Sequence, residues 1–555
     1  MKKTPLKPFD PKSPMTHPSR RGFLGMTMIA AAGLGLGGFP RGAKAQASGQ
    51  VIVGISQEPT VFNPHLLHIE VDEGIHWAIF DPLFSVEPDG TFAPRLVTEV
   101  PTVENGGVSA DGTEWRIRLK EGVTWHDGTP LTAEDVKFTL ELQKDENFRA
   151  ARRTGHELIE EITVVSDTEL TWKMSSAFAP YMAILSWTFI IPKHAFGEGV
   201  DPNEAPFNQS PIGTGPYKWD SRAPGDNIQL VANPDYYGDG ASIERVVVKY
   251  VPDLTVLYTQ FRTGEIDVIA LQGISPDHYA EATALPGKEV VLVPVGTVET
   301  LSLNLANPVL ADKAVRQALY LGVDKQTVID ALYYGLPTAT ETYMPQQSFY
   351  YDDTLPTHVY DPEEGKAILE AAGWVPGSDG IRVKDGQRLS FVCSTTAGNH
   401  VREQLQQFLQ QSWLDMGIEM EIANLPPAVM WSDHWMQSQF DMAVAGIIFL
   451  TGPDPDTTDY FHTNAINAQG GAGQNTFQFS DPRVDELLIE GATTVSPEAR
   501  KPIYAEIQQT IREELPFLPL FQRNEVRGHA EALQGYEPNI NVRITFWNMQ
   551  DWSWA

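Results

Sequence analysis

Residues 119–135 read Leu-Lys-Glu-Gly-Val-Thr-Trp-His-Asp-Gly-Thr-Pro-Leu-Thr-Ala-Glu-Asp, and their composition predicts a turn followed by a helix. Asp, Gly and Pro within residues 127–130 favour turn backbone, because Gly accepts a positive φ and Pro presets its own φ. Thr132 and Asp135 then have the capping-box spacing that marks the start of a helix. Just upstream, residues 115–119 alternate between apolar and charged side chains, as a strand with one buried face does. The sequence therefore predicts a strand, a turn and a helix in succession.

Outward from this stretch, the pattern of apolar residues changes at about residue 300. Before that point, short β-type runs occur at residues 51–56, 246–251 and 290–295. After it, strands and helices alternate, which is typical of an α/β lobe with a largely parallel sheet. The predicted order is a helix after Asp312, a helix after Asp361, a strand at 389–393, a helix at 400–416, a strand at 418–422, a helix near 427–437 and an apolar run at 440–448.

Length and composition bound the class of protein. The chain has 555 residues, which exceeds what one hydrophobic core holds and predicts two or more domains. Hydrophobic residues make up 42% and aromatic residues 10%, as in an ordered globular protein. The 72 acidic residues outweigh the 40 basic ones, so the net charge is −32. Such a surface repels nucleic acid and anionic lipid, and we expect neither as a partner.

The N-terminal segment has the features of an export leader. Residues 19–24 read Ser-Arg-Arg-Gly-Phe-Leu, an uncharged run rich in Gly and Ala follows, and Ala43-Lys-Ala45 supplies small residues for cleavage. A paired arginine before such a run resembles a twin-arginine signal. The alternative, a short core helix, conflicts with the number of glycines in the run. We therefore expect residues 1–45 to be removed after twin-arginine export, and the mature chain to work in the periplasm.

Cysteine and histidine usage bears on anchors and metals. Cys393 is the only cysteine, so no intrachain disulfide forms and no lipid-modified cysteine follows the leader. The apolar run at 440–450 is too short to span a bilayer. His65 and His68, followed by Glu70, are a weak metal signal, because a site needs three or four ligands in geometry. We expect no metal.

Several motifs along the chain, together with residues 119–135, resemble one family. The further motifs are Ile79–Phe84, Asp89-Gly90, Ala93–Leu96, Pro211–Tyr217, Asn233–Tyr236, Gly264–Asp267, Val315–Leu319 with Asp324, Ala371–Trp374 and Asp454-Pro455. The family is that of the extracytoplasmic solute-binding proteins of ABC importers, family 5, which includes dipeptide-, oligopeptide- and nickel-binding members. Most of the motifs are scaffold. Gly213, Gly215 and Pro216 suit a tight bend, and we expect His126 to be a hydrogen-bonding turn residue rather than a catalyst.

The resemblance implies an α/β, two-lobed periplasmic-binding-protein fold with an extra subdomain in lobe one. In such a fold a hinge joins the lobes, and the ligand is buried between them when they close. Segments near 290–295 and 520–525 are the hinge candidates. The expected bounds are 51–298 together with 522–555 for lobe one, 85–210 for the subdomain inserted in it, and 299–521 for lobe two.

The resemblance also implies a function. We expect the protein to capture a small solute as a monomer and to deliver it to ABC permease subunits in the inner membrane. A short peptide is the commonest cargo; an oligosaccharide, an opine or another polar organic solute is the alternative. An exported cofactor enzyme is the alternative from a different class. The cysteine clusters, haem-attachment motif and Gly-x-Gly-x-x-Gly loop that it would need do not occur in the mature chain. We therefore expect no catalytic residues and no cofactor.

Candidate ligand contacts come from the same resemblance. In peptide-binding relatives an aspartate of lobe two pairs with the peptide's α-ammonium, and the matching position here is Thr451. A hydroxyl cannot supply the charge that a desolvated ammonium needs. Either a neighbouring carboxylate substitutes or the ligand lacks a free α-amine. Trp431 and Trp435 could stack on a ligand or could be core residues. The four candidates at 72–77 are expected on a loop near the cleft. The full set is Asp72, Glu73, His76, Trp77, Trp431, Trp435, Phe449, Thr451, Asp454 and Asp456.

Overall fold

The computed structural model describes residues 48–450, 452–542 and 545–555, apart from the side chains of Leu271, Gln272 and Thr545. The expected leader at 1–45 and the candidate contact Thr451 therefore lie outside the described residues. In the described part of the chain, the helices are all too short or too polar to cross a membrane.

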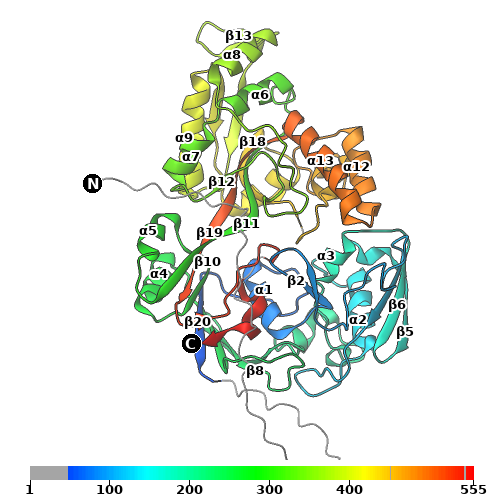
Figure 1. Ribbon diagram of the computed structural model, residues 1–555. Coiled ribbons are helices and arrows are strands. Elements are labelled where there is room, and N and C mark those ends of the chain that lie inside the picture. The colour runs from blue at the N-terminus through cyan, green and yellow to red at the C-terminus, as the bar shows by residue number, and fades with distance from the viewer. Residues whose placement is uncertain (1–47, 451, 543–544) are drawn as a thin grey trace, which may run out of the picture. The chain divides into compact units, whose positions relative to one another are not determined.

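A mixed sheet of 11 strands has β11 and β19 near its middle (Figure 1). From these two strands the order is β18, β16, β17 toward one edge and β10, β1, β9, β8, β7 toward the other, while β12 pairs with β19. β16 is parallel to β17 and β18, which confirms the parallel strands predicted after residue 300. β11 is antiparallel to both of its neighbours. The bounds are β1 Gln50–Ile55, β7 Tyr217–Ala223, β8 Asn227–Ala232, β9 Arg245–Tyr250, β10 Val268–Ile274, β11 Lys288–Leu303, β12 Thr338–Ala339, β16 Ser390–Ser394, β17 Glu419–Ile422, β18 Met442–Ile448 and β19 Phe517–Ala530.

The helices predicted after residue 300 are present, and their first residues explain why they begin where they do. Side chains of Asp312, Asp361 and Asn399 each accept a hydrogen bond from a backbone N–H of the first turn, as N-caps do. Pro at the first helical position further favours the start of three of the helices named below. The bounds are α6 Lys313–Leu321, α7 Lys325–Leu332, α8 Pro362–Ala371, α9 His400–Leu414, α12 Pro482–Thr493 and α13 Pro497–Glu514.

The helix predicted near 427–437 is present over residues 427–436, but it is kinked rather than regular. The structure has a short turn, α10 (Pro427–Val429), followed by a single π-type turn at Met430–His434. Ser432 interrupts it with φ −95° and ψ −136°, and its hydroxyl donates to the carbonyl of Val429. A serine hydroxyl that donates to a nearby backbone carbonyl competes with the backbone hydrogen bonds of the helix, and this explains the kink.

The strand and helix around residues 115–135 are confirmed. β4 (Glu114–Arg118) pairs antiparallel with β6 (Glu169–Met174), which pairs with β5 (Ile159–Ser166). Apolar residues of β4 are buried and its arginines are exposed, as the alternation predicts. Helix α2 (Ala133–Lys144) begins with the predicted capping box, in which the Thr132 N–H donates to the Asp135 carboxylate at 2.9 Å. This small sheet and helix have an apolar core of their own.

Two larger apolar cores are connected by β11 and β19. The first core includes Val51, Val246 and Ile75 and underlies β1, β9 and α1 (Glu70–Ile79). The second core includes Leu319 and Leu405 and lies among β16, β18, α6 and α9. The C-terminal part of β11 and the N-terminal part of β19 contribute to the second core, and their other ends pack beside β10. The two strands run side by side (Figure 1), and the pairing register shifts midway, between Pro294 and Val298.

The bend at residues 213–216 is confirmed as a close-packed turn around His126. The Gly215 N–H donates to the carbonyl of Ile79 at 2.8 Å, and His126 Nδ1 accepts from the Gly213 N–H at 3.2 Å. His126 Nε2 lies 3.1 Å from the Gly215 carbonyl. A Cβ added to Gly213 would lie 1.9 Å from the Ile79 carbonyl oxygen. Only glycine fits this approach of two backbone segments.

The variant Gly213→Ala is therefore expected to lower the free energy of unfolding by about 3 kcal/mol or more, because backbone must shift to admit the methyl group. Urea denaturation followed by fluorescence measures this change. Gly296→Ala is the matched control, since a Cβ there meets only Ile448 at 3.9 Å. Equal stability of the two variants would contradict the close approach.

Candidate functional site

A cavity of about 450 Å³ lies between residues that extend from the first core and residues that extend from the second. On the first side its lining comes from the start of α1, the β2–β3 turn and the α3 region. On the second side it comes from the loop at 345–350, the segment after β18 and the start of α13. β11 and β19 also line it, together with Arg152, the end of β18 and the C-terminal segment at 539–542. The elements not yet bounded are β2 Phe84–Val86, β3 Phe92–Pro94 and α3 Tyr181–Leu185.

Direct contacts bridge the two sides beside the cavity. The Ala179 N–H donates to the Ala492 carbonyl at 2.7 Å, joining the segment before α3 to the last turn of α12. A Cβ added to Gly452 would lie 3.3 Å from Trp187 Nε1, and one added to Gly90 would lie 3.7 Å from Pro453. The cavity is therefore partly walled off from solvent by paired surfaces.

Asp454 lines the cavity, and its charge is matched by Arg500 of α13. Arg500 Nη1 and Nη2 donate to the two carboxylate oxygens at 2.7 and 2.9 Å, and its Nε donates to the Gly491 carbonyl. The guanidinium also lies over the rings of Tyr350 and Tyr504. A bidentate, buried pair of this kind leaves little charge for a ligand.

Asp456, the other candidate carboxylate near position 451, is not among the residues that line the cavity. Its Oδ1 accepts from the backbone N–H and the hydroxyl of Thr458 at 3.2 and 2.6 Å. Burial, with a smaller effect of the Asp454 charge, raises the pKa of Asp456 to about 6.

The aromatic candidates lie beside the cavity or outside it rather than among its lining residues. Phe449 is buried and stacks with Phe461 and Phe517. Trp435 is buried and stacks on Phe440 with ring centroids 5.3 Å apart. Trp431 is 41% exposed, and its ring centroid is 5.4 Å from that of Trp435.

The four candidates at 72–77 were expected on a loop, and that was wrong, because they lie in helix α1. Asp72 is buried and accepts from the N–H groups of Ile69, Thr60 and Val61, so it satisfies the backbone at the start of the helix. The four candidates are buried and do not line the cavity, whereas Glu70 of the same helix does. His76 Nε2 lies 2.8 Å from the Val61 carbonyl oxygen. The Glu73 carboxylate lies 3.4 Å from His68 Nε2, and the Trp77 ring packs against the Phe189 ring.

A buried carboxylate between two guanidiniums lies where β11 and β19 cross from one core to the other. Glu299 of β11 has no exposed surface. Arg402 of α9 donates to it from Nε at 2.6 Å and from Nη2 at 3.2 Å, and Arg523 of β19 donates from Nε at 2.9 Å and also from Nη2. Burial acts to raise the pKa of Glu299, but the two guanidiniums hold it at about 2. Arg523 lines the cavity.

The sequence alone carries a signal for this buried charged group, although the group was not among the predicted site residues. Glu299 is a charged residue inside an apolar strand pattern, and Arg523 closely follows the apolar run at 515–521. A charge at such a position is rarely tolerated unless it is paired, so the two could have been matched with each other. Arg152 and Trp187 of the cavity were also missed; the Arg152 guanidinium lies over the indole ring at 5.2 Å.

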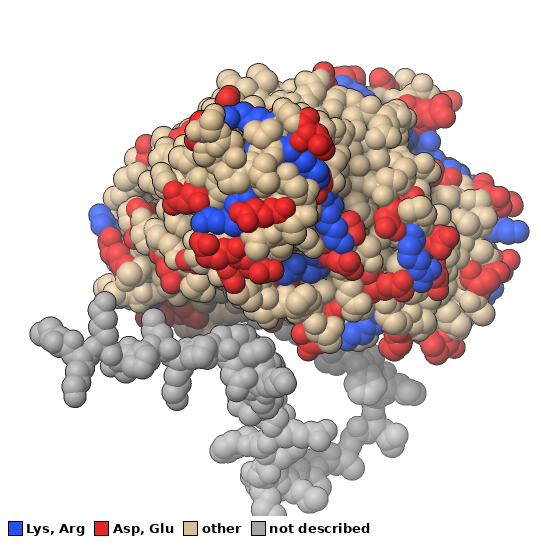
Figure 2. Space-filling view, turned by 90° about the horizontal axis from the view of Figure 1, so that it is seen from above, with Lys and Arg blue, Asp and Glu red and all other residues tan. Residues whose placement is uncertain are grey.

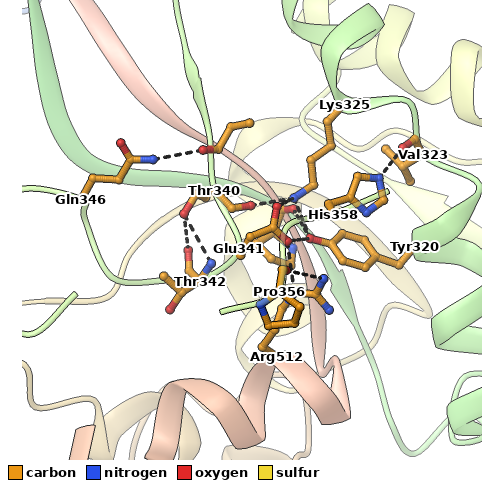
Figure 3. Close-up of polar contacts among 12 residues, drawn as sticks. Tyr320, Val323, Lys325, Thr340, Glu341, Thr342, Gln346, Pro356, His358 and Arg512 are labelled. Atoms are coloured by element: carbon orange, nitrogen blue, oxygen red, sulfur yellow. Dashed lines mark hydrogen bonds and ion pairs between the residues drawn. The ribbon is translucent and has the colours of Figure 1, made fainter. Parts of the chain in front are cut away.

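A second charged cluster contacts residues 340 and 341, in the chain that leads into the cavity loop at 345–350 (Figure 3). Lys325 Nζ donates to the Tyr320 hydroxyl and the Thr340 carbonyl, each at 2.6 Å, and to Glu341 at 3.1 Å. Arg512 of α13 donates to the other oxygen of Glu341 at 3.1 Å. The cluster thus ties α7 and α13 to the chain that leads into the loop. Among the described residues, no group of three or more His, Cys, Asp or Glu side chains could hold a metal ion.

Comparison with known proteins defines the class. The model of "Bacterial extracellular solute-binding proteins, family 5 Middle" matches residues 91–469. The oligopeptide-binding protein AppA of Bacillus subtilis is 27% identical, with 92% of each chain covered. The nickel-binding periplasmic protein of Escherichia coli is 26% identical, with 80% of this chain and 83% of the relative covered. The structure of B. subtilis AppA in complex with a nonapeptide matches with a TM-score of 0.76 and 26% identity, covering 92% of this chain and all of that one.

The chain belongs to the bacterial extracellular solute-binding proteins of family 5. The predicted α/β fold of two lobes, the periplasmic-binding-protein fold, is confirmed by its likeness to the AppA structure. It is a solute-binding component of the kind that works with ABC permeases outside the cytoplasm.

Proposed function

We propose that the protein captures a short peptide in the cavity between its lobes and delivers it to an ABC permease in the inner membrane. The observation that carries the proposal is the cavity itself. Its volume of about 450 Å³ suits a small ligand, and both lobes and both connecting strands line it. The first core with the β4–β6 subdomain supports lobe one at 51–298 and 522–555, and the second core supports lobe two at 299–521.

The chemistry of the lining favours a peptide over a purely apolar ligand. Carboxamides of Gln347 and Asn541 can pair with peptide groups, and Trp187 and Phe349 offer apolar surface for side chains. Guanidinium and carboxylate groups both line the cavity, as a zwitterionic ligand requires. AppA, which is similar over almost the whole chain, is an oligopeptide-binding protein.

The remaining parts of the proposal come from the sequence and the surface. Export through the twin-arginine route rests on Arg20-Arg21, and it implies folding before export to the periplasm. Acidic and basic side chains are interspersed over the face shown in Figure 2, which suits a monomer that avoids nucleic acid. Binding without chemistry and without a cofactor is proposed because the charged groups of the cavity pair with one another rather than with a nucleophile.

An oligosaccharide, an opine or another polar organic solute is the second candidate. One observation favours it: the indole of Trp187 lines the cavity, and indole rings can stack on sugar rings.

Thermal unfolding with panels of short peptides, sugars and opines tests the proposal. A ligand that binds only the folded form at about 100 times its Kd adds about 2.7 kcal/mol of stability, so the peptide panel should raise the Tm clearly. The variant Gly296→Leu is expected to abolish this rise, because a side chain there enters the cavity with room for its Cβ. A rise with sugars or opines alone would favour the second candidate, and no rise with any panel would contradict solute capture.

A further inference from the structure

Three guanidiniums line the cavity, and their partners differ. Arg500 is fully matched, since one carboxylate accepts from both of its Nη atoms and a carbonyl accepts from its Nε. Arg152 lies over Trp187 and has a further polar or charged contact. Arg523 shares the single carboxylate of Glu299 with Arg402. Arg523 therefore has only part of a negative charge as its partner.

The one other carboxylate of β19 lines the cavity and acts on the Arg523 charge, but it has an arginine partner of its own. Glu525, two residues further along β19, is the nearest other carboxylate on the strand, and Arg527 pairs with it at 3.3 Å. The three arginines 402, 523 and 527 thus face two carboxylates, Glu299 and Glu525. The group as a whole carries one unmatched positive charge, at the place where β11 and β19 pass from lobe to lobe.

Arg523 also has donors to spare. Its Nε and Nη2 both donate to one oxygen of Glu299, which leaves Nη1 outside the pair. Nη1 has no hydrogen bond within the described residues and is not among the fully buried atoms. The side chain is 31% exposed, and that exposure is toward the cavity that it lines.

The position of the guanidinium is fixed by its neighbours. A Cβ added to Gly446 of β18 would lie 3.0 Å from Arg402 Nη2 and from Glu299 Oε2, and 3.1 Å from Arg523 Cζ. The cluster of Glu299, Arg402 and Arg523 therefore packs closely against the backbone of β18. Its three side chains come from β11, α9 and β19. Preorganised donors of this kind bind an anion with little ordering cost.

We propose that Arg523 binds the carboxylate of the ligand, which places the acidic end of the solute at the hinge between the lobes. The inference rests on the proposed function, and for a peptide the group bound is the C-terminal carboxylate. The anion completes the charge balance of a group formed by β11, β19 and α9, so its binding favours the arrangement of the two lobes that holds this group together.

The test compares two matched probes: mixtures of short peptides made without Asp and Glu, one with free C-terminal carboxylates and one with C-terminal amides. Isothermal titration calorimetry gives the apparent Kd of each. The wild type is expected to bind the free acids at least about tenfold more tightly, as a lost charged hydrogen bond predicts. Arg523→Gln is expected to remove most of this preference and Arg523→Lys to keep part of it.

Arg483→Gln, which replaces an exposed arginine of α12, is the matched control and should keep the wild-type preference. Arg523→Gln still leaves Glu299 paired with Arg402, so it should fold, and circular dichroism checks this. Equal affinity of the wild type for acids and amides, or an unchanged preference in folded Arg523→Gln, would overturn the inference while the proposed function stands. Failure of the wild type to bind either mixture would overturn both.

Discussion

Lowering the pH from 7 to 5 is expected to reduce the free energy of unfolding by about 5 kcal/mol. Burial lowers the pKa of His65 and of His126 to about 4 and that of His156 to about 3, from an ordinary value of 6.5. The unfolded chain therefore takes up protons below its ordinary histidine pKa, whereas the folded chain does not. The contribution of each histidine to the free energy of unfolding is fully present above about pH 6.5 and decreases as the pH falls toward the pKa of the folded state. At pH 5 the loss is about 2 kcal/mol for each histidine.

Buried carboxylates with a raised pKa, such as Asp456 and Asp81, work in the opposite direction. The pKa of Asp456 is raised from 3.8 to about 6, so the folded chain takes up this proton before the unfolded chain does. That uptake returns about 1 kcal/mol at pH 5, which is included in the expected total. His76, whose pKa burial holds well below its ordinary value, adds to the loss.

Urea denaturation at the two pH values measures the effect. His156→Gln is expected to be less stable than the wild type at pH 7 but to lose about 2 kcal/mol less on acidification. His400→Gln is the control and should keep the full loss, because the His400 side chain is 86% exposed. The same stability at both pH values would show that the buried imidazoles take up protons without cost.

Replacing Glu299 with Gln is expected to cost about 3–5 kcal/mol of unfolding free energy, the usual penalty for removing one partner of a buried ion pair. The carboxylate is fully buried between Arg402 and Arg523, and without it two guanidiniums face each other. Because β11, β19 and α9 all contribute to the group, the loss should appear as global unfolding at lower urea concentration.

Two further variants separate charge from packing. Glu299→Gln combined with Arg523→Gln should recover part of the loss, because one of the two facing charges is gone. Glu513→Gln removes an exposed carboxylate of α13 that pairs with Lys313, and it should cost less than about 1 kcal/mol. A Glu299→Gln protein as stable as Glu513→Gln would mean that the buried group contributes nothing.

Helices and strands that depend on residues close in sequence could be predicted from the sequence. The strand at 115–119 and the helix after Thr132 depend on alternation and on a capping pair three residues apart, and both are as expected. The same holds for the parallel strands β16, β17 and β18, since strand and helix patterns alternate in that region. The bend at Gly213 was also predictable, though not that Ile79 makes glycine necessary there.

The rest depends on contacts between distant residues. Asp454 meets Arg500 from 46 positions away, and Glu299 meets Arg523 from 224 positions away, so no local pattern shows that these charges are paired. Helix α1 was missed because its start depends on Asp72 bonding backbone of residues 60 and 61 as well as its own N-cap. The cavity is lined by more than six separate segments, and their meeting is a property of the whole fold.

Native mass spectrometry of the protein purified from the cells that produce it tests the capture of a peptide most directly. The account predicts a fraction of the protein with added mass, from which short peptides are released on denaturation and sequenced. Gly296→Leu, with its cavity filled, should carry none. A wild-type protein that carries no solute, or a filled variant that carries the same solutes as the wild type, would contradict capture in this cavity.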